Sequence, residues 1–349
     1  MKIFQCDNCN SPLFFENHKC EKCERLLGYR DSDQQLLGFA PWRASLISDK
    51  EQFEFKYCMN EQYGICNWLL PKNATQDYCS ACQLNRTIAN LSVDQNFENW
   101  RHLEIAKHRL VYQLQRIGFD LRSKLTHDEG LCFDFIAKND DPNIMTGHSD
   151  GVITILIKEA DPTFREQAKK KLGEPYRTLI GHLRHEVGHY FWNILIRDNS
   201  YTLQTFRSIF GNEQYSYNDA LRTYYQNGAP SNWRQSFISE YATSHPWEDW
   251  AETWAHYLHI MDMFETAHFF NLEVNDKTTP ENKRVTSTFD PYTIQDFETI
   301  VRKCIPISYA VNSINRAMGI SDVYPFIITP NVIHKMTFIH ELLLPRRKL

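Results

Sequence analysis

The chain has 349 residues, enough for two or three domains with a buried core. Hydrophobic residues make up 42% and charged residues 23% of the sequence, the composition of an ordinary folded protein, which excludes a fibrous or wholly disordered chain. Its 38 Lys and Arg residues against 43 Asp and Glu residues give a net charge of -5, which argues against a strongly basic nucleic-acid-binding protein.

The N-terminal segment MKIFQCDNCNSPLFF lacks the basic start and the following apolar stretch of an export signal. No run elsewhere approaches the roughly 18 consecutive apolar residues of a membrane-spanning helix. We therefore expect a cytoplasmic protein without a membrane partner.

Eight of the ten cysteines lie in the first 82 residues, and the first four form two Cys-x2-Cys pairs. The two-residue gap in each pair lets both thiolates approach one metal ion from a tight turn. Four thiolates suit a structural zinc site, and metal binding would supply folding free energy that so short a segment lacks. Two disulfides are the alternative, which a reducing cytosol disfavours. The predicted ligands are Cys6, Cys9, Cys20 and Cys23.

A second set of four cysteines ends in another Cys-x2-Cys pair. Cys58 and Cys66 are more widely spaced than the pairs of the first set, whereas Cys79 and Cys82 repeat the compact pair. We predict a second zinc site here. Because four thiolates leave no open coordination position, we expect both sites to be structural.

The charge of the cysteine-rich segment bears on what it could contact. Residues 1–30 carry five Lys and Arg residues against four Asp and Glu residues, an excess of one positive charge. Binding dominated by phosphate contacts needs a larger excess, so nucleic acid is not expected as a partner. We predict that residues 1–92 form a zinc-ribbon region that caps the protein or contacts a protein partner, and that residues 93–349 form the second domain.

The middle of the chain predicts one long helix, two strands and a short helix. Apolar residues recur at steps of three and four between residues 96 and 119, which indicates an amphipathic helix. Segments 130–137 and 151–157 are rich in apolar and β-branched residues, which favours strands. Asp161 followed by proline suits the start of a short helix that reaches residue 172.

The segment His185-Glu186-Val-Gly-His189 has the spacing of a zinc-binding helix. Residues four apart on an α-helix differ by about 40° around its axis, so both imidazoles can reach one zinc ion. Glu186 lies beside them, where it could take a proton from zinc-bound water and deliver it to the leaving amine. The alternative is a pair of histidines on an ordinary buried helix.

His182 lies on nearly the same face, three residues before His185. It could be a further ligand, but we expect it to contact the ligands or the substrate instead, because the His185 and His189 pair already satisfies the motif. A metzincin would carry glycine and histidine where this chain has Trp192 and Leu195, so that class is excluded.

A third ligand must therefore come from elsewhere, and a helix predicted to start at Pro246 offers two glutamates. Glu248 and Glu252 are four residues apart, so they share one face of this helix. Two carboxylates on a helix are usually solvated, but this helix is crowded with aromatic residues. We assign Glu248 as the third ligand and Glu252 as the acceptor that holds a ligating imidazole in place.

The C-terminal stretch predicts helices around residues 311–318 and 332–344. His340 and Glu341 repeat the first half of the zinc motif, but Leu344 stands where its second histidine would be. We therefore expect a core helix there, with no metal site.

The His185–His189 segment and the segment that carries Glu248 and Glu252 together resemble the gluzincin metallopeptidases, which include thermolysin and anthrax lethal factor. In that class the first glutamate of the second helix binds zinc and the next acidic residue lies behind a ligand, roles that the resemblance implies for Glu248 and Glu252. Tyr241, seven residues before Glu248, is similar to the tyrosine that stabilises the oxyanion in the lethal-factor-like arrangement.

The whole chain also resembles a bacterial family that joins an N-terminal zinc ribbon to a zinc-binding metallopeptidase domain. The segments that carry this resemblance are 57–60, 66–70, 79–85, 185–189, 245–259 and 315–326. It implies an α+β fold, in which a small β-rich zinc-ribbon module precedes a mainly helical, zincin-like domain. The resemblance brings no substrate; from the motifs themselves we expect hydrolysis of a peptide or protein substrate, with one catalytic and two structural zinc ions. A catalytically silent zinc-binding scaffold and a hydrolase of a non-peptide amide remain alternatives.

Overall fold

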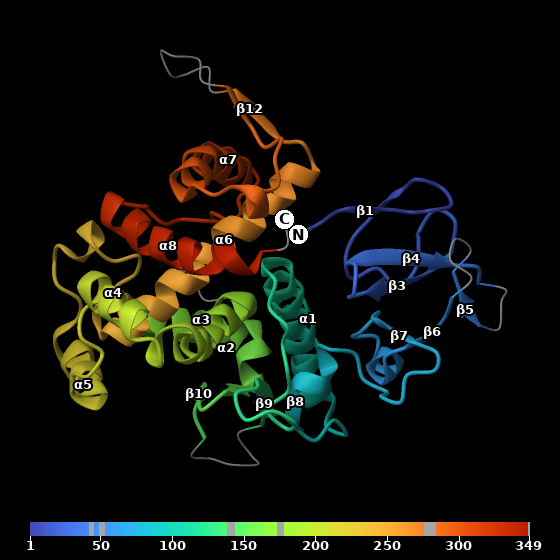
Figure 1. Cartoon of the computed structure of the whole chain (residues 1–349), viewed down its shortest axis with the longest axis horizontal. Coiled ribbons are helices and arrows are strands. Elements are labelled where there is room, and N and C mark those ends of the chain that lie inside the picture. The colour runs from blue at the N-terminus through green and yellow to red at the C-terminus, as the bar shows by residue number, and fades with distance from the viewer. Residues whose placement is uncertain (42–44, 49–52, 138–143, 173–177, 276–283, 348–349) are drawn as a thin grey trace. The chain divides into compact units, whose positions relative to one another are not determined.

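The computed structural model describes residues 1–41, 45–48, 53–137, 144–172, 178–275 and 284–347. The chain forms two compact units (Figure 1). The first comprises residues 1–115, 120–146 and 151–161, and the second comprises residues 116–119, 147–150 and 162–349. Among the described residues, no helix combines the length and the apolar character that crossing a bilayer demands.

The cysteine-rich part of the first unit is built from short antiparallel strands. Their bounds are β1 (Phe4–Gln5), β2 (Pro12–Leu13), β3 (Leu26–Arg30), β4 (Gln35–Phe39), β5 (Leu46–Ile47), β6 (Glu54–Tyr57) and β7 (Leu69–Pro71). β1 pairs with β2, β3 with β4, and β6 with both β5 and β7. The buried side chains of Phe39, Phe55 and Leu69 join these small sheets in one apolar cluster.

Gly28 on β3 permits close packing against β7. A Cβ atom at this position would lie 2.4 Å from Leu69 Cδ2, a distance that real Cβ contacts do not reach. The absence of a side chain therefore lets the apolar cluster close over both strands.

Helix α1 (Asp94–Ile117) packs against the cysteine-rich strands within the first unit. The Tyr112 ring lies 5.2 Å from the Phe15 ring, and the His108 ring lies 5.5 Å from the Trp68 ring. Because of this packing, the boundary between the compact units does not coincide with the expected division after residue 92. That division stays a prediction of domain organisation.

Three parallel strands complete the first unit. β9 (Cys132–Ile136) lies between β8 (Asn85–Ile88) and β11 (Val152–Leu156). The strands predicted at 130–137 and 151–157 are present as β9 and β11, and every residue of β9 is buried. β8 was not predicted, because its sequence Asn-Arg-Thr-Ile lacks an apolar pattern.

The second unit is mainly helical (Figure 1). Its helices are α2 (Pro162–Leu172), α3 (Leu179–Trp192), α4 (Ser200–Phe210), α5 (Tyr217–Asn227), α6 (Pro246–Phe269), α7 (Phe297–Ala317) and α8 (Pro330–Leu343). The short strands β10 (Gly147–Ser149), β12 (Glu273–Asn275) and β13 (Arg284–Thr286) accompany them. The predicted α+β class, with a β-rich module before a mainly helical domain, is confirmed.

Helix α6 is the centre of the second unit, since it contacts α3, α4, α7 and α8. Pro246 occupies its first turn and the His245 side chain accepts a hydrogen bond from the Trp247 amide, so the helix starts where the sequence predicts. Most residues of α6 are buried, on more than one face of the helix, which explains why its aromatic residues are not confined to one face.

Helices α3 and α6 are in close contact at Gly188. A Cβ atom there would lie 3.0 Å from the Ala251 Cα atom, and Trp250 Nε1 donates a hydrogen bond of 2.8 Å to the Gly188 carbonyl oxygen. The small residues Gly188 and Ala251 thus set the distance between the two helices.

Replacing Gly188 by valine would place a branched side chain where α3 and α6 touch. We expect the free energy of unfolding to fall by about 1–3 kcal/mol, the usual cost of overpacking a core. Urea unfolding of the full chain measures the change. The Glu341→Val variant, at an exposed position of α8, is the control for the helix propensity of valine; equal losses in both variants would contradict the close-contact explanation.

His340 is buried on α8 as a neutral imidazole. Its Nε2 atom donates to the Ile294 carbonyl oxygen at 3.1 Å, and its Nδ1 atom lies 3.0 Å from Nη2 of Arg347. Burial, followed by the charge of Arg347, lowers the pKa of His340 to about 4. The predicted core helix at this position is therefore present, and the histidine belongs to its core.

This lowered pKa predicts a pH-dependent contribution to stability. In the unfolded chain His340 binds a proton below about pH 6.5, whereas in the folded chain it does so only near pH 4. Between these values the unfolded state holds more protons, so stability is lost as the pH falls from about 6.5 to about 4, by at most about 1.4 kcal/mol per pH unit. Urea unfolding across this range should show a shallower pH dependence for His340→Gln than for the unsubstituted protein; equal slopes would refute the assignment.

Candidate metal centre

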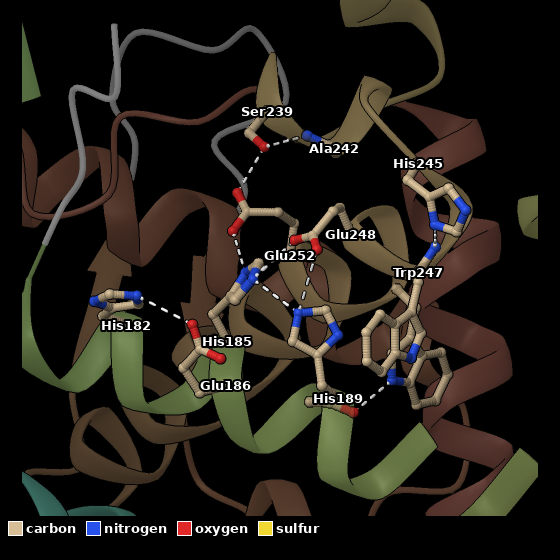
Figure 2. A network of polar contacts seen from close by, with 12 residues as sticks. His182, His185, Glu186, His189, Ser239, Ala242, His245, Trp247, Glu248 and Glu252 are labelled. Carbon is tan, nitrogen blue, oxygen red and sulfur yellow. Dashed lines mark hydrogen bonds and ion pairs between the residues drawn. The ribbon is translucent and has the colours of Figure 1, made fainter. Parts of the chain in front are cut away.

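Three side chains from two helices converge in the second unit (Figure 2). Helix α3 presents His185 and His189 from successive turns, and their Nε2 atoms lie 3.2 Å apart. Helix α6 contributes Glu248, whose Oε2 atom lies 3.0 Å from His185 Nε2 and whose Oε1 atom lies 3.5 Å from His189 Nε2. The structure thus brings together the three residues that the sequence predicted as ligands.

The spacing of these atoms fits a tetrahedral zinc ion. Zinc bonds of about 2.0–2.1 Å to nitrogen and oxygen place neighbouring ligand atoms about 3.3 Å apart. The His185 Nε2 atom lies 3.2 Å from His189 Nε2 and 3.0 Å from Glu248 Oε2. Within the described part of the chain, Glu248 Oε2 has no hydrogen-bond partner, although only 1% of Glu248 is exposed. Two imidazoles and one carboxylate form the ligand set of catalytic zinc sites.

Glu252 holds the His185 ring from behind. His185 Nδ1 donates a hydrogen bond of 2.7 Å to Glu252 Oε1, so Nδ1 carries a proton and Nε2 is left to face the centre. The other carboxylate oxygen accepts a hydrogen bond of 2.6 Å from Ser239 Oγ. Burial alone would raise the pKa of Glu252, but the hydrogen bond and charge of His185 lower it to about 2. The position agrees with the role predicted for Glu252.

Glu186 lies next to the three converging residues and contacts His182. The Nε2 atom of His182 is 3.2 Å from Glu186 Oε1. Burial opposes ionisation of Glu186, but His182 and the neighbouring histidines hold the pKa of its carboxyl below the usual value. Glu186 is therefore ionised at neutral pH and can accept a proton. His182 thus lies beside Glu186 and is not one of the three converging residues, which agrees with the role expected for it from the sequence.

Two tyrosines border the centre. Tyr241, which the sequence singled out, begins a 3-10 turn (Tyr241–Thr243) and its ring lies 6.0 Å from the His185 ring. Tyr217, on α5, donates a hydrogen bond of 2.6 Å to Glu248 Oε1. Burial raises the pKa of both phenols well above the usual value, so both keep their protons.

Sequence reasoning missed Tyr217, Ser239 and Trp247 as neighbours of the centre. The Trp247 ring lies 4.2 Å from the His189 ring, and its place next to Glu248 in the sequence was a usable signal. Ser239 and Tyr217 precede Glu248 by 9 and 31 residues and belong to no motif, so only the tertiary structure identifies them.

Both predicted cysteine sets form clusters in the first unit, with one sulfur atom from each residue within 4.8 Å of the others. Neighbouring sulfur atoms in the first set are 3.5 and 3.6 Å apart, and two in the second set are 3.7 Å apart. Zinc–sulfur bonds of about 2.3 Å require a sulfur separation of about 3.8 Å in a tetrahedron. All ten cysteines, each in the described part of the chain, are free thiols, so disulfides do not account for either cluster.

The two clusters differ in their surroundings. Cys9 and Cys23 of the first set are partly exposed, whereas all four cysteines of the second set are buried. Cys82 Sγ of the second set lies 3.5 Å from His108 Nε2 on α1. The other ring nitrogen, Nδ1, donates to the Glu104 carbonyl oxygen at 2.7 Å, which fixes the ring. His108 was not predicted from the sequence, because 26 residues separate it from Cys82.

The comparisons with known families agree with both halves of the structure. A family model described as "Putative zinc-binding metallo-peptidase" matches residues 96–342, and a model of a zinc-ribbon domain matches residues 3–93. The chain therefore belongs to the family that this description names, and a zinc-ribbon segment precedes the matched part. The family resemblance seen in the sequence is confirmed, and these matches together with the cysteine clusters identify zinc as the metal.

Similar proteins occur in mycobacteria. An uncharacterized protein of Mycobacterium bovis and an uncharacterized protein of Mycobacterium tuberculosis are each 36% identical to the chain over 343 residues. These residues span 97% of this chain and 94% of each relative, so the similarity includes both the zinc ribbon and the metallopeptidase segment. No solved structure matches the chain.

The His108 contact predicts how firmly the second cysteine cluster holds zinc. Removing the imidazole with His108→Ala should accelerate zinc loss from this cluster about 10-fold or more, as is typical when a partner of a metal ligand is lost. Release to a colorimetric chelator, followed by native mass spectrometry of the full chain, measures it. His102→Ala, at an exposed position of the same helix, is the control; identical release from both variants would mean that His108 does not support the cluster.

Proposed function

We propose that the protein is a zinc-dependent metallopeptidase that hydrolyses peptide bonds at the centre formed by His185, His189 and Glu248. The observation that carries this proposal is the convergence of two imidazole nitrogens and one carboxylate oxygen at 3.0–3.2 Å, beside an ionised Glu186. A structural zinc site would have four protein ligands, whereas three leave a position open for water and substrate.

Zinc, when bound, supplies Lewis-acid chemistry: it lowers the pKa of a water molecule and polarises the scissile carbonyl group. His185, His189 and Glu248 are the residues that would hold the ion. Glu252 keeps the His185 ring in the tautomer that this binding needs, because it accepts the Nδ1 proton.

Glu186 is the general base and then the general acid. Its carboxylate takes the proton of the attacking water and passes it to the leaving amine. Its ionised state at neutral pH, which His182 and the neighbouring histidines favour, supports the first of these roles. His182 contacts one carboxylate oxygen of Glu186 at 3.2 Å and so limits how the group can turn.

Tyr241 is proposed to steady the negative charge that develops on the carbonyl oxygen. Its phenol keeps a proton to donate, because burial raises its pKa, and its ring lies 6.0 Å from the His185 ring. A donor already in place when the charge forms is the usual means of stabilising such an oxygen.

The proposal includes three zinc ions, one catalytic and two structural. The two structural ions belong to the cysteine clusters, whose four thiolates leave no position for a substrate. A peptide or protein is the proposed substrate, and the zinc ribbon is a candidate surface for a protein partner. The cytoplasmic location expected from the sequence stays a prediction.

Glu186→Gln tests the chemistry separately from metal binding. The amide cannot accept the proton of the attacking water, so we expect cleavage of a peptide library to fall by about 10²- to 10⁴-fold while the zinc content per chain is unchanged. Mass spectrometry of the library and elemental analysis of the protein measure both quantities.

Glu240→Gln, which changes an exposed carboxylate near Tyr241 in the sequence, is the matched control and should cleave normally. Unchanged cleavage in Glu186→Gln would remove Glu186 from the mechanism. If the unsubstituted, zinc-loaded protein cleaves no peptide or protein, the silent scaffold replaces the enzyme as the better description.

A further inference from the structure

The two oxygens of Glu248 have different surroundings. Oε1 accepts the hydrogen bond of 2.6 Å from the Tyr217 hydroxyl and lies farther, 3.5 Å, from His189 Nε2. Oε2 has no hydrogen-bond partner within the described residues and lies 3.0 Å from His185 Nε2, so it faces the metal centre. A carboxylate can bind a metal through one oxygen or through both, and the Tyr217 hydrogen bond distinguishes the two oxygens of Glu248.

Tyr217 is held in place by the start of α6. Its ring lies 5.3 Å from the His245 ring and 6.0 Å from the Trp247 ring, and these two residues flank Pro246 at the first turn of α6. His245 Nε2 also donates to the Tyr215 carbonyl oxygen at 3.1 Å, which fixes the chain just before α5. The phenol is therefore anchored to the same helix that carries Glu248.

The rest of α5 is weakly anchored. Every residue of this helix, all of them described, is exposed or only partly buried. Two side chains of α5 reach the residues around the centre: the Tyr217 hydroxyl contacts Glu248, and the Tyr224 ring lies 5.8 Å from the Tyr241 ring. Of these two, only Tyr217 contacts a proposed ligand of the metal.

We infer that Tyr217 is a positioning residue that restricts Glu248 to binding the catalytic metal through one oxygen. This inference rests on the proposed function. Because Oε1 accepts the hydrogen bond from the phenol, Oε2 is the oxygen better placed to bind the metal, and single-oxygen binding would leave the fourth coordination position open for water or substrate. The proposed roles of the two neighbouring tyrosines differ, because Tyr217 donates to a metal ligand whereas Tyr241 is proposed to donate to the substrate oxygen.

Tyr217→Phe removes the hydroxyl and keeps the ring contacts. Tyr201→Phe is the matched control, because Tyr201 is 78% exposed on α4. The catalytic site of each full-length protein is emptied with a chelator under conditions that leave zinc on the cysteine clusters, since thiolates hold zinc more firmly. One equivalent of Co²⁺ is then added as a probe, because its visible absorption weakens when its coordination number rises.

We expect Tyr217→Phe to show weaker cobalt absorption than the unsubstituted protein, because Glu248 then binds through both oxygens. With zinc restored, kcat should fall about 10-fold or more while KM changes little, since the additional oxygen occupies the position that the reaction needs. Tyr201→Phe should match the unsubstituted protein in both measurements. A purely structural role of Tyr217 would alter stability but leave the cobalt spectrum unchanged.

The outcomes separate this inference from the function on which it rests. If the unsubstituted protein binds Co²⁺ in a manner that His185→Ala abolishes, and Tyr217→Phe gives the same spectrum and kcat as the unsubstituted protein, the inference is overturned and the proposed function stands. If the unsubstituted protein binds no Co²⁺ at these residues, both are overturned.

Discussion

The close contact between α3 and α6 is the constraint on which the metal centre depends. Zinc binding by this motif needs a third ligand, and Glu248 is 59 residues beyond His189 in the sequence. Gly188 and Ala251 allow the helices to approach, and Trp250 ties them by a hydrogen bond to the Gly188 carbonyl oxygen. Gly188 lies between Glu186 and His189 and has no side chain. It thus lets α6 come close enough for Glu248 to join the two histidines.

The second feature of the centre is its burial of charge. Glu186, Glu248 and Glu252 are carboxylates in one buried region, and each has a pKa below the usual value because histidines face it. Burying ionised groups costs free energy unless opposite charges offset it. A divalent cation held by Glu248 and two imidazoles would supply such an offset, so metal binding and the stability of this region are expected to be coupled.

The sequence predicted His185, His189 and the eight cysteines as ligands because their local spacing relates them. A four-residue step on a helix places His185 and His189 on one face, and a two-residue gap places two thiolates at one turn, whatever the rest of the chain does. The helix expected between residues 96 and 119, which is α1, the start of α6 at Pro246 and the strands β9 and β11 were likewise recognisable from periodicity or from helix-start residues. β8, α4 and α5 were not predicted; for β8 the reason is its sequence Asn-Arg-Thr-Ile, which lacks an apolar pattern.

The sequence by itself thus determined the kind of metal chemistry, the eight thiolates and the two histidines, since those depend on residues a few positions apart. Only the tertiary structure decided which residues support them. Tyr217 reaches Glu248, Ser239 reaches Glu252 and His108 reaches Cys82. Each of these contacts joins segments on different elements, and their geometry is fixed by helix packing. Packing sums many weak, non-local contacts, so no local pattern in the sequence reports it.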